Sequence, residues 1–318
     1  MARATYTLNP IQQVCYYLAK SLVCLVSLLP LRVLYIISDA CYVLLYYVIK
    51  YRRNIVRKNL KASFSTKEQA ELQHIEREFY HWFCDYLVET IKLFTISKSQ
   101  MRKRMRFKGV DVVHSTISNG QSIALYLGHY CNWEWVSSIP LWVSGNYAGS
   151  QVYHVLESPV MDKLLLYPRH RMGSDNVPMA DVLRYIINNK RENRPVLMGF
   201  IADQVPFWNN IGHWVDFLSH PQTPILTGTE KLARRFDMAC VYIDLRRIRR
   251  GYYEAEFQLM TYKPNEKPQL SISAEYFARL EYSINRQPAY WLWTHNRWKR
   301  TREEYDKMID PETGKLKF

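Results

Sequence analysis

The hydrophobic pattern divides the chain into an apolar beginning and a longer part in which apolar and polar positions alternate. Residues 11–49 are the most apolar part of the 318 residues. The polar or helix-breaking residues that interrupt this run are Lys20, Pro30, Arg32 and Asp39. Because proline breaks a helix, Pro30 separates two apolar helical segments, and 33–49 is the cleaner of the two. That segment is about as short as a membrane-spanning helix can be. We therefore predict an N-terminal helical membrane anchor over residues 1–50.

A basic segment follows the predicted anchor. Residues 50–61, KYRRNIVRKNLK, are dense in Lys and Arg and contain no acidic residue. Such a cluster belongs on the cytoplasmic side of a membrane, and it can also grip anionic lipid headgroups. A cleavable signal peptide is disfavoured, because charges interrupt the apolar run and no small-residue cleavage site follows a compact apolar core. Three arrangements stay open: a spanning or re-entrant helix, helices lying in the interface, and an amphipathic hairpin packed on a soluble core.

From residue 66 onward, helical and strand-like periods follow one another. Apolar residues recur at helical spacing over 66–95, where Ser65 or Thr66 can cap the helix, and a basic connector over 98–108 comes next. We expect strands over residues 122–128, 149–156, 194–203, 238–248 and 251–260. We expect further helices over residues 132–143, 158–171, 180–189, 229–236, 272–285 and 291–301.

This alternation predicts an α/β fold. The central sheet is expected to be mixed and flanked by helices, because two strands follow each other directly late in the chain. No internal repeat, low-complexity tract or long linker interrupts residues 66–318. The simplest partition is therefore the anchor over residues 1–50 and one domain of catalytic size over residues 51–318.

Charge and composition narrow the class of partner. The formal net charge is +14, and aromatic residues make up 14% of the chain. This balance favours an anionic partner, and amphipathic rings beside basic residues suit a membrane interface. A tyrosine-rich core with a solvated basic face is the alternative. A nucleic-acid partner is disfavoured, because no DNA- or RNA-binding motif accompanies the apolar N-terminus. The six cysteines are scattered, which indicates free thiols in a reducing compartment and no metal site.

The candidate chemistry lies in IALYLGHYCNWEW, residues 123–135. His129 follows the predicted strand at its carboxyl end, where open α/β sheets place ligands. Asn132 can cap the next helix, which puts Glu134 in the first turn of that helix. Across such a corner the two side chains can meet, and a carboxylate on one ring nitrogen would leave the other nitrogen as a base. One alternative is that His129 is merely a polar residue with satisfied hydrogen bonds. Another is that His129 activates Cys131 as a thiol nucleophile, although we prefer a packed, unreactive thiol for Cys131.

Five blocks of the chain follow one another in an order that a known family shares. They are GHYCNWEW (128–135), VYHVLESPVMDKLLLYPRHRMG (152–173), GFIADQ (199–204), TPILTGTEKLARRF (223–236) and PAYWLWTHNRWKR (288–300). The first contains His129 and Glu134 in an HxxxxE motif. In these blocks the chain resembles the lipid A late acyltransferases of the lauroyl and myristoyl type, within the lysophospholipid acyltransferase superfamily. It departs from them at His154, where arginine is usual, and at Ala289 and Tyr290, where Glu-Gln is usual.

The resemblance implies a glycerolipid acyltransferase-like fold and roles for individual residues. It makes His129 the general base on an acceptor hydroxyl, with Glu134 orienting its ring. It makes Arg171 a candidate for stabilising the oxyanion or for gripping an anionic substrate, the alternative being a surface charge near a helix end. A second catalytic histidine at His295 is disfavoured.

Four further residues are candidates for binding substrate. Asp203 and Gln204 follow a predicted strand at its carboxyl end, where they can shape the pocket floor, although Asp203 can also simply cap or turn the chain. Lys231 and Arg234 are candidates for contacting phosphate, and a solvated helix face is the alternative.

The resemblance implies a membrane-bound O-acyltransferase on the cytoplasmic side of the bacterial inner membrane. It would move a fatty acyl chain from an acyl carrier protein thioester, or a coenzyme A thioester, to a hydroxyl of a lipid A precursor. The expected partners are therefore acyl carrier protein, an anionic lipid acceptor and the membrane, and no cofactor or metal is expected because the thioester is already activated. Two alternatives stay open: an acyltransferase acting on a lysophospholipid or aminolipid, and a non-catalytic membrane scaffold.

Overall fold

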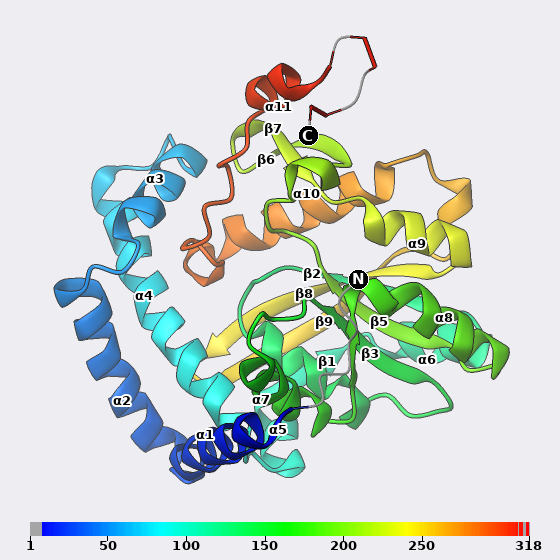
Figure 1. Cartoon of the computed structure of the whole chain (residues 1–318). Helices are drawn as coiled ribbons and strands as arrows, with labels where there is room; N and C mark the ends of the chain where they lie inside the picture. The colour runs from blue at the N-terminus through cyan, green and yellow to red at the C-terminus, as the bar shows by residue number, and fades with distance from the viewer. Residues whose placement is uncertain (1–7, 311, 314–315, 318) are drawn as a thin grey trace.

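A mixed sheet of seven strands forms the centre of the protein in the computed structural model, which describes residues 8–310, 312–313 and 316–317 (Figure 1). Its strands are β1 (Met105–Lys108), β2 (Ile123–Leu127), β3 (Ala148–Tyr153), β4 (Asp175–Pro178), β5 (Val196–Ile201), β8 (Ala239–Arg249) and β9 (Tyr252–Thr261). They are ordered β1-β9-β8-β2-β5-β3-β4, and only β8 and β9 pair antiparallel. The predicted mixed α/β sheet is confirmed. Every residue of β2 is buried, as expected for a central parallel strand.

Helices cover both faces of this sheet. They are α4 (Gln69–Lys92), α5 (Lys98–Arg104), α6 (Val110–Ser118), α7 (Pro159–His170), α8 (Val182–Arg191), α9 (Gly228–Phe236) and α10 (Ser271–Arg286). In Figure 1, α9 and α10 lie on one side of the sheet, and α5 and α6 lie on the other. The crossovers through α6 and α9 run in opposite directions along the strand order, so right-handed connections put these helices on opposite faces.

A small hairpin and a short helix close one end of the molecule. Strands β6 (His213–Phe217) and β7 (His220–Ile225) form a separate two-stranded antiparallel sheet, and α11 (Arg302–Met308) lies beside them (Figure 1). The sequence pattern did not predict these elements. Two prolines within β7, Pro221 and Pro224, obscure the strand signal because proline is normally confined to edge strands.

The apolar N-terminus folds as two helices that break at Pro30, as predicted. They are α1 (Pro10–Leu28) and α2 (Leu31–Val43), and α2 continues into a π-helical turn, η1 (Leu44–Val48). Within the described residues, the segments Pro10–Leu28 and Leu31–Val48 are long and apolar enough to cross a membrane by length and composition. The basic segment that follows forms α3 (Arg53–Ser63).

Polar contacts bind one side of α2 to α4 and to the β8–β9 turn. The Tyr35 hydroxyl donates to Glu89 on α4 (2.8 Å), and the Ser38 hydroxyl donates to Asp85 on the same helix (2.7 Å). Arg250, at the β8–β9 turn, pairs with both Asp85 and Asp39 (2.6 Å each). The opposite sides of α1 and α2 are exposed and apolar. We call these residues the α1–α2 apolar face: Ile11, Val14, Tyr17, Leu18, Leu22, Leu25, Leu28, Val33, Ile36, Ile37, Val43, Leu44, Tyr47 and Val48.

Three local predictions were wrong. Residues 291–301 form no helix, because the carbonyls of Trp293 and His295 accept hydrogen bonds from the distant Asn59 amide (2.9 and 3.0 Å). The basic connector over 98–108 instead forms α5 and the edge strand β1. The first long helix begins at Gln69 rather than after Ser65 or Thr66.

Candidate active site

Strand register brings the histidine of the HxxxxE motif to a carboxylate on the neighbouring strand. Strands β2 and β5 are parallel, and Leu127 is paired with Ile201. His129 and Asp203 each lie two residues beyond this pair, at the carboxyl edge of the sheet. The His129 ring Nδ1 lies 2.6 Å from Asp203 Oδ1, and the His129 backbone N–H donates to Oδ2 (3.0 Å). Asp203 therefore fixes both the ring and the backbone of His129.

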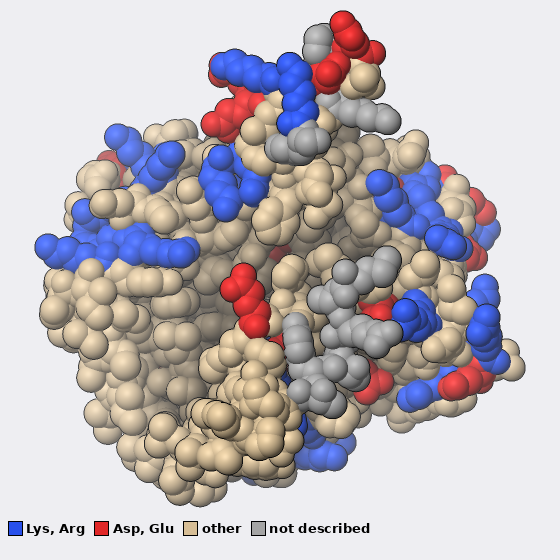
Figure 2. Space-filling model, viewed as in Figure 1, with Lys and Arg blue, Asp and Glu red and all other residues tan. Residues whose placement is uncertain are grey.

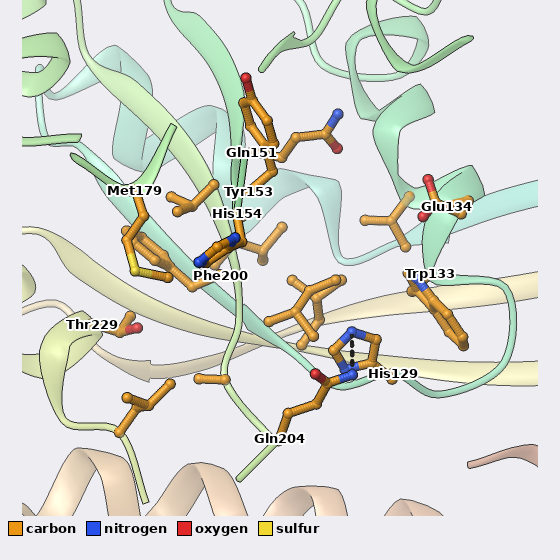
Figure 3. A pocket seen from close by; sticks show the side chains of 18 of the residues that line it. His129, Trp133, Glu134, Gln151, Tyr153, His154, Met179, Phe200, Gln204 and Thr229 are labelled. Carbon is orange, nitrogen blue, oxygen red and sulfur yellow. Dashed lines mark hydrogen bonds between the residues drawn. The ribbon is translucent and has the colours of Figure 1, made fainter. Parts of the chain in front are cut away.

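Asp203 is held as a buried carboxylate. Its exposed fraction is 1%, and the Trp291 indole N–H also donates to Oδ2 (2.8 Å). Burial alone would raise the pKa of Asp203, but His129 and the hydrogen bonds from His129 and Trp291 lower it to about 2. The ionised carboxylate accepts a hydrogen bond from the N–H at Nδ1, which leaves the lone pair of the ring on Nε2, where it can act as a base. In Figure 3, Gln204 lies beside His129, and its amide nitrogen is 3.3 Å from Nε2, where an amide N–H can donate to the ring.

The predicted contact between His129 and Glu134 is wrong. In the described chain, the carboxylate that bonds the His129 ring is Asp203, and Glu134 forms a two-pronged ion pair with Arg169 on α7 (2.7 and 2.6 Å). Asn132 caps the turn as predicted, accepting from the Trp135 backbone N–H (3.1 Å). The segment that follows is a 3-10 helix, η2 (Trp133–Leu141), rather than an α-helix. Figure 3 shows Glu134 well separated from His129 across the cavity.

The Glu134–Arg169 pair is a second charged unit of the site. Both side chains line the same cavity as His129, and Trp133 packs edge-on against the His129 ring with 5.1 Å between ring centroids. Burial alone would lower the pKa of Arg169, but Glu134 raises it, so the guanidinium stays charged. Sequence reasoning missed Arg169. The only available signal was its place in the same block as Arg171, two residues earlier.

A cavity of about 970 Å³ opens from His129 into the protein. Its apolar wall comes from several strands and helices and includes Leu125, Leu127, Val136, Ile139, Leu165, Leu166, Val182, Leu197 and Phe200. The polar groups of the site stand along this wall, as Figure 3 shows for His129, Gln204 and Glu134. Such a cavity suits a hydrocarbon chain with its reactive end at His129.

All three cationic residues that were predicted to bind substrate lie outside the cavity lining. Arg171 donates to the carbonyls of Leu93 (2.7 Å) and Ile96 (3.4 Å), just beyond the end of α4, and does not line the cavity. Arg234 donates to Glu230 (2.7 Å) and to backbone carbonyls near Pro264. Lys231 is exposed on α9 outside the cavity lining. The predictions that Arg171 and Arg234 bind substrate are therefore corrected, because their guanidinium groups donate hydrogen bonds to acceptors within the protein. Lys231 does not line the cavity.

Two competing nucleophile or base candidates are disfavoured by their surroundings. Cys131 is fully buried with φ of 50°, its backbone N–H donates to the Tyr290 carbonyl (2.8 Å), and burial raises the pKa of its thiol well above its usual range. A thiol in this environment stays protonated. His295 Nε2 accepts from the Val205 backbone N–H (3.1 Å), and burial lowers the pKa of His295 to about 4. Within the described residues, no group of three or more His, Cys, Asp or Glu side chains could hold a metal ion.

The fold and the site together define a class of protein. A histidine held by a buried aspartate at the carboxyl edge of a mixed sheet, opening into a long apolar cavity, indicates an α/β enzyme with a lipid substrate. The family model for bacterial lipid A biosynthesis acyltransferases matches residues 3–300, so the chain belongs to that family and is an acyltransferase. The family implies a lipid acceptor. A comparison with curated proteins gave no match.

Replacing Asp203 by Asn tests the assignment of the His129 partner. The amide cannot hold the proton on Nδ1, so we expect acyl transfer to fall by about 10²- to 10⁴-fold. Because the pKa of Asp203 is lowered by folding, its ionisation stabilises the protein at neutral pH, and this contribution disappears as the pH falls toward 2. Activity of detergent-solubilised protein is the measurement, with the exposed Asp306→Asn as the matched control. Near-normal activity of Asp203→Asn would contradict the assignment.

A double-mutant cycle separates the two roles open to Glu134. If Glu134 acts by holding Arg169, then Glu134→Gln and Arg169→Gln each lower the rate of acyl transfer, and the double variant is no worse than the poorer single variant. Each single change also leaves one uncompensated charge, which costs about 3–5 kcal/mol of stability for a fully buried pair and less for this partly exposed one. Thermal unfolding in detergent measures that loss. Fully additive losses of rate would show that Glu134 acts independently of Arg169.

Proposed function

We propose that the protein transfers a fatty acyl chain from a thioester to a hydroxyl of a lipid A precursor, with His129 as the general base. The observation that supports this most directly is the orientation of the His129 ring. Nδ1 is held by the buried Asp203, and Nε2 lies at the apolar cavity. The family supplies the reaction class, and acyl carrier protein or coenzyme A would carry the thioester.

The geometry supports a direct transfer of the acyl chain to the acceptor hydroxyl, in which His129 takes up the hydroxyl proton. His129 Nε2 takes the proton of the acceptor hydroxyl as its oxygen attacks the thioester carbon. The tetrahedral intermediate then collapses, the carbon–sulfur bond breaks, and the thiolate leaves with the proton held on Nε2. Asp203 stabilises the imidazolium between these steps, because the carboxylate is ionised and bonded to Nδ1. No covalent enzyme intermediate is required.

Arg169 takes the place that the sequence suggested for Arg171. Two of its five N–H donors bind Glu134, which fixes the plane of the guanidinium in the cavity wall. Its remaining donors are available for the oxyanion of the intermediate or for an anionic group of the substrate. The Gln204 amide, beside Nε2, can orient the hydroxyl that approaches His129.

The lipid profile of whole cells tests the proposed reaction. A deletion strain complemented with the native chain should regain an acyl chain on lipid A, seen as a mass increase in intact lipid A. His129→Ala should fail to restore it, because the base is lost. His74→Ala changes an exposed histidine on α4 and serves as the control.

Two outcomes would contradict the proposal. Restoration by His129→Ala would remove the base from the mechanism. Unchanged lipid A together with altered lysophospholipids or aminolipids would favour the alternative acceptor, for which the departure at His154, a residue of the cavity wall, is the motivating observation.

The α1–α2 apolar face supports attachment to a membrane. Figure 2 shows few charged side chains over α1 and α2, and a band of Lys and Arg beside them over α3. The exposed cations there are Lys50, Arg52, Arg57, Lys58 and Lys61. We propose that both helices lie in the interface, with the apolar face in the acyl region and the cations at the headgroups, on the cytoplasmic side of the inner membrane. The contacts of Tyr35 and Ser38 with α4 favour this arrangement over a spanning helix.

Polar substitutions on α1 test the interfacial arrangement. Leu18, Leu22 and Leu25 are 64–67% exposed, so changing all three to Ser removes membrane-facing apolar surface while leaving the core intact. We expect the membrane-bound fraction after alkaline carbonate washing to fall at least about tenfold, since each leucine contributes roughly 1–2 kcal/mol of burial in lipid. The triple change of Ile248, Tyr262 and Tyr282 to Ser, all exposed elsewhere, is the control. Full retention of the α1 variant would favour a spanning helix.

A further inference from the structure

Two adjacent cations at the mouth of the cavity have no carboxylate partner. The cavity lining includes three Lys or Arg residues: Arg169, Lys299 and Arg300. Arg169 is paired with Glu134. Among the described residues, no carboxylate lies within ion-pair distance of Lys299 or Arg300. Lys299 is exposed, and Arg300 is half-buried. This end of the cavity therefore keeps a concentrated positive charge.

The surroundings of Arg300 hold its guanidinium in place without using up its donors. One N–H, from Nη1, donates to the Pro206 carbonyl (2.9 Å). The guanidinium lies over the rings of Phe207 and Trp208, 5.5 and 5.3 Å from their centroids. Its Nε is buried and has no hydrogen-bond partner. An arginine that is stacked and only partly bonded is preorganised to bind an anion with its remaining N–H groups.

The short segment that connects Gln204 to Pro206 limits the distance between His129 and the Arg300 guanidinium. Gln204 lies beside His129, the Val205 N–H donates to His295, and the Pro206 carbonyl accepts from Arg300. The segment after β5 thus runs along the C-terminal segment from the base to the mouth. Because two or three residues span at most about 10 Å, the charge lies within that order of distance along the chain from Gln204. An anionic group bound there is therefore close enough to His129 to be part of a substrate that reacts at that residue.

We propose that Lys299 and Arg300 form a binding subsite for a phosphate ester of a substrate, placed at the mouth of the acyl cavity. The proposal rests on the proposed function and deepens it, because both substrates of that reaction carry such a group. One source is a phosphate on the lipid acceptor, and the other is the phosphate of a donor's pantetheine arm. The subsite takes over the role that the sequence assigned to Lys231 and Arg234, which lie outside the cavity.

Steady-state kinetics with matched substrates test the subsite and identify the source of the phosphate. The variants are Lys299→Gln and Arg300→Gln, and Lys231→Gln is the control because it removes an equally exposed cation outside the cavity. Loss of one charge-assisted hydrogen bond should raise KM for the phosphate-bearing substrate by about tenfold to hundredfold, with kcat little changed. The acceptor arm compares a phosphorylated lipid A precursor with its dephosphorylated form. The donor arm compares an acyl thioester of phosphopantetheine with that of pantetheine.

If Lys299→Gln and Arg300→Gln raise KM for the phosphorylated acceptor but not for the dephosphorylated acceptor, the subsite binds the lipid phosphate. The same pattern in the donor arm assigns it to the pantetheine phosphate. Unchanged KM values in both arms, or an equal rise for the control variant, would overturn the proposal.

A binding measurement keeps the subsite testable apart from the reaction. The probe is a short-chain phosphatidic acid, with the matching diacylglycerol as its phosphate-free control, followed through tryptophan fluorescence because Trp208 lies under Arg300. We expect the native chain to prefer the phosphatidic acid, Lys299→Gln to lose that preference, and Lys231→Gln to keep it. If no acyl transfer occurs but this pattern holds, the proposed function fails and the subsite stands. If Lys299→Gln binds as the native chain does, the subsite fails.

Discussion

The hydrogen bond between His129 and Asp203 is the interaction on which the site depends. It joins the carboxyl ends of two central parallel strands, and it exists because Leu127 and Ile201 are in register. The same carboxylate accepts the Trp291 indole N–H, so the irregular C-terminal segment also meets the pair. Space around it is tight. A side chain at Gly128 would place its Cβ 2.7 Å from Leu280 and 3.3 Å from the Asp203 carboxylate. Glycine therefore follows the strand at the point where His129 approaches Asp203.

A second network connects this site to the N-terminal helices. Asn132, whose side chain begins η2, donates to the buried Glu89 carboxylate (2.6 Å). The same carboxylate accepts from Tyr35 on α2 and from Tyr253 on β9 (2.8 Å each). The segment that carries His129 and Glu134 is therefore anchored to α4, to the sheet and to the apolar helices. Two pairs therefore lie along the cavity: His129 is held by Asp203, and Arg169 is held by Glu134.

The sequence predicted the overall architecture and the position of His129 at the end of a strand, because both follow from local periodicity. His129 at a strand end and Asn132 as a cap needed only residues that are close in the chain. The partner of His129 could not be predicted in this way. Asp203 was recognised at the carboxyl end of another strand, but pairing it with His129 requires knowing that β2 and β5 are neighbours and in which register. Glu134 was chosen instead because it was near in sequence.

The same limit explains the errors over the cations. Arg169 and Arg171 belong to one block, but they point in different directions near the end of α7, and only the packing of that helix shows that Arg169 faces the cavity. Lys299 and Arg300 were hidden in a segment predicted to be a helix, which Asn59 prevents by bonding its carbonyls from a distant helix.

Selective ¹⁵N-histidine NMR of the detergent-solubilised protein tests the central claim most directly. The account predicts that His129 carries its proton on Nδ1, with a strongly downfield resonance typical of a hydrogen bond to a buried carboxylate. That resonance should disappear in Asp203→Asn and persist in Glu134→Gln. A downfield proton that persists without Asp203 and disappears without Glu134 would contradict the account and restore the pairing that the sequence first suggested.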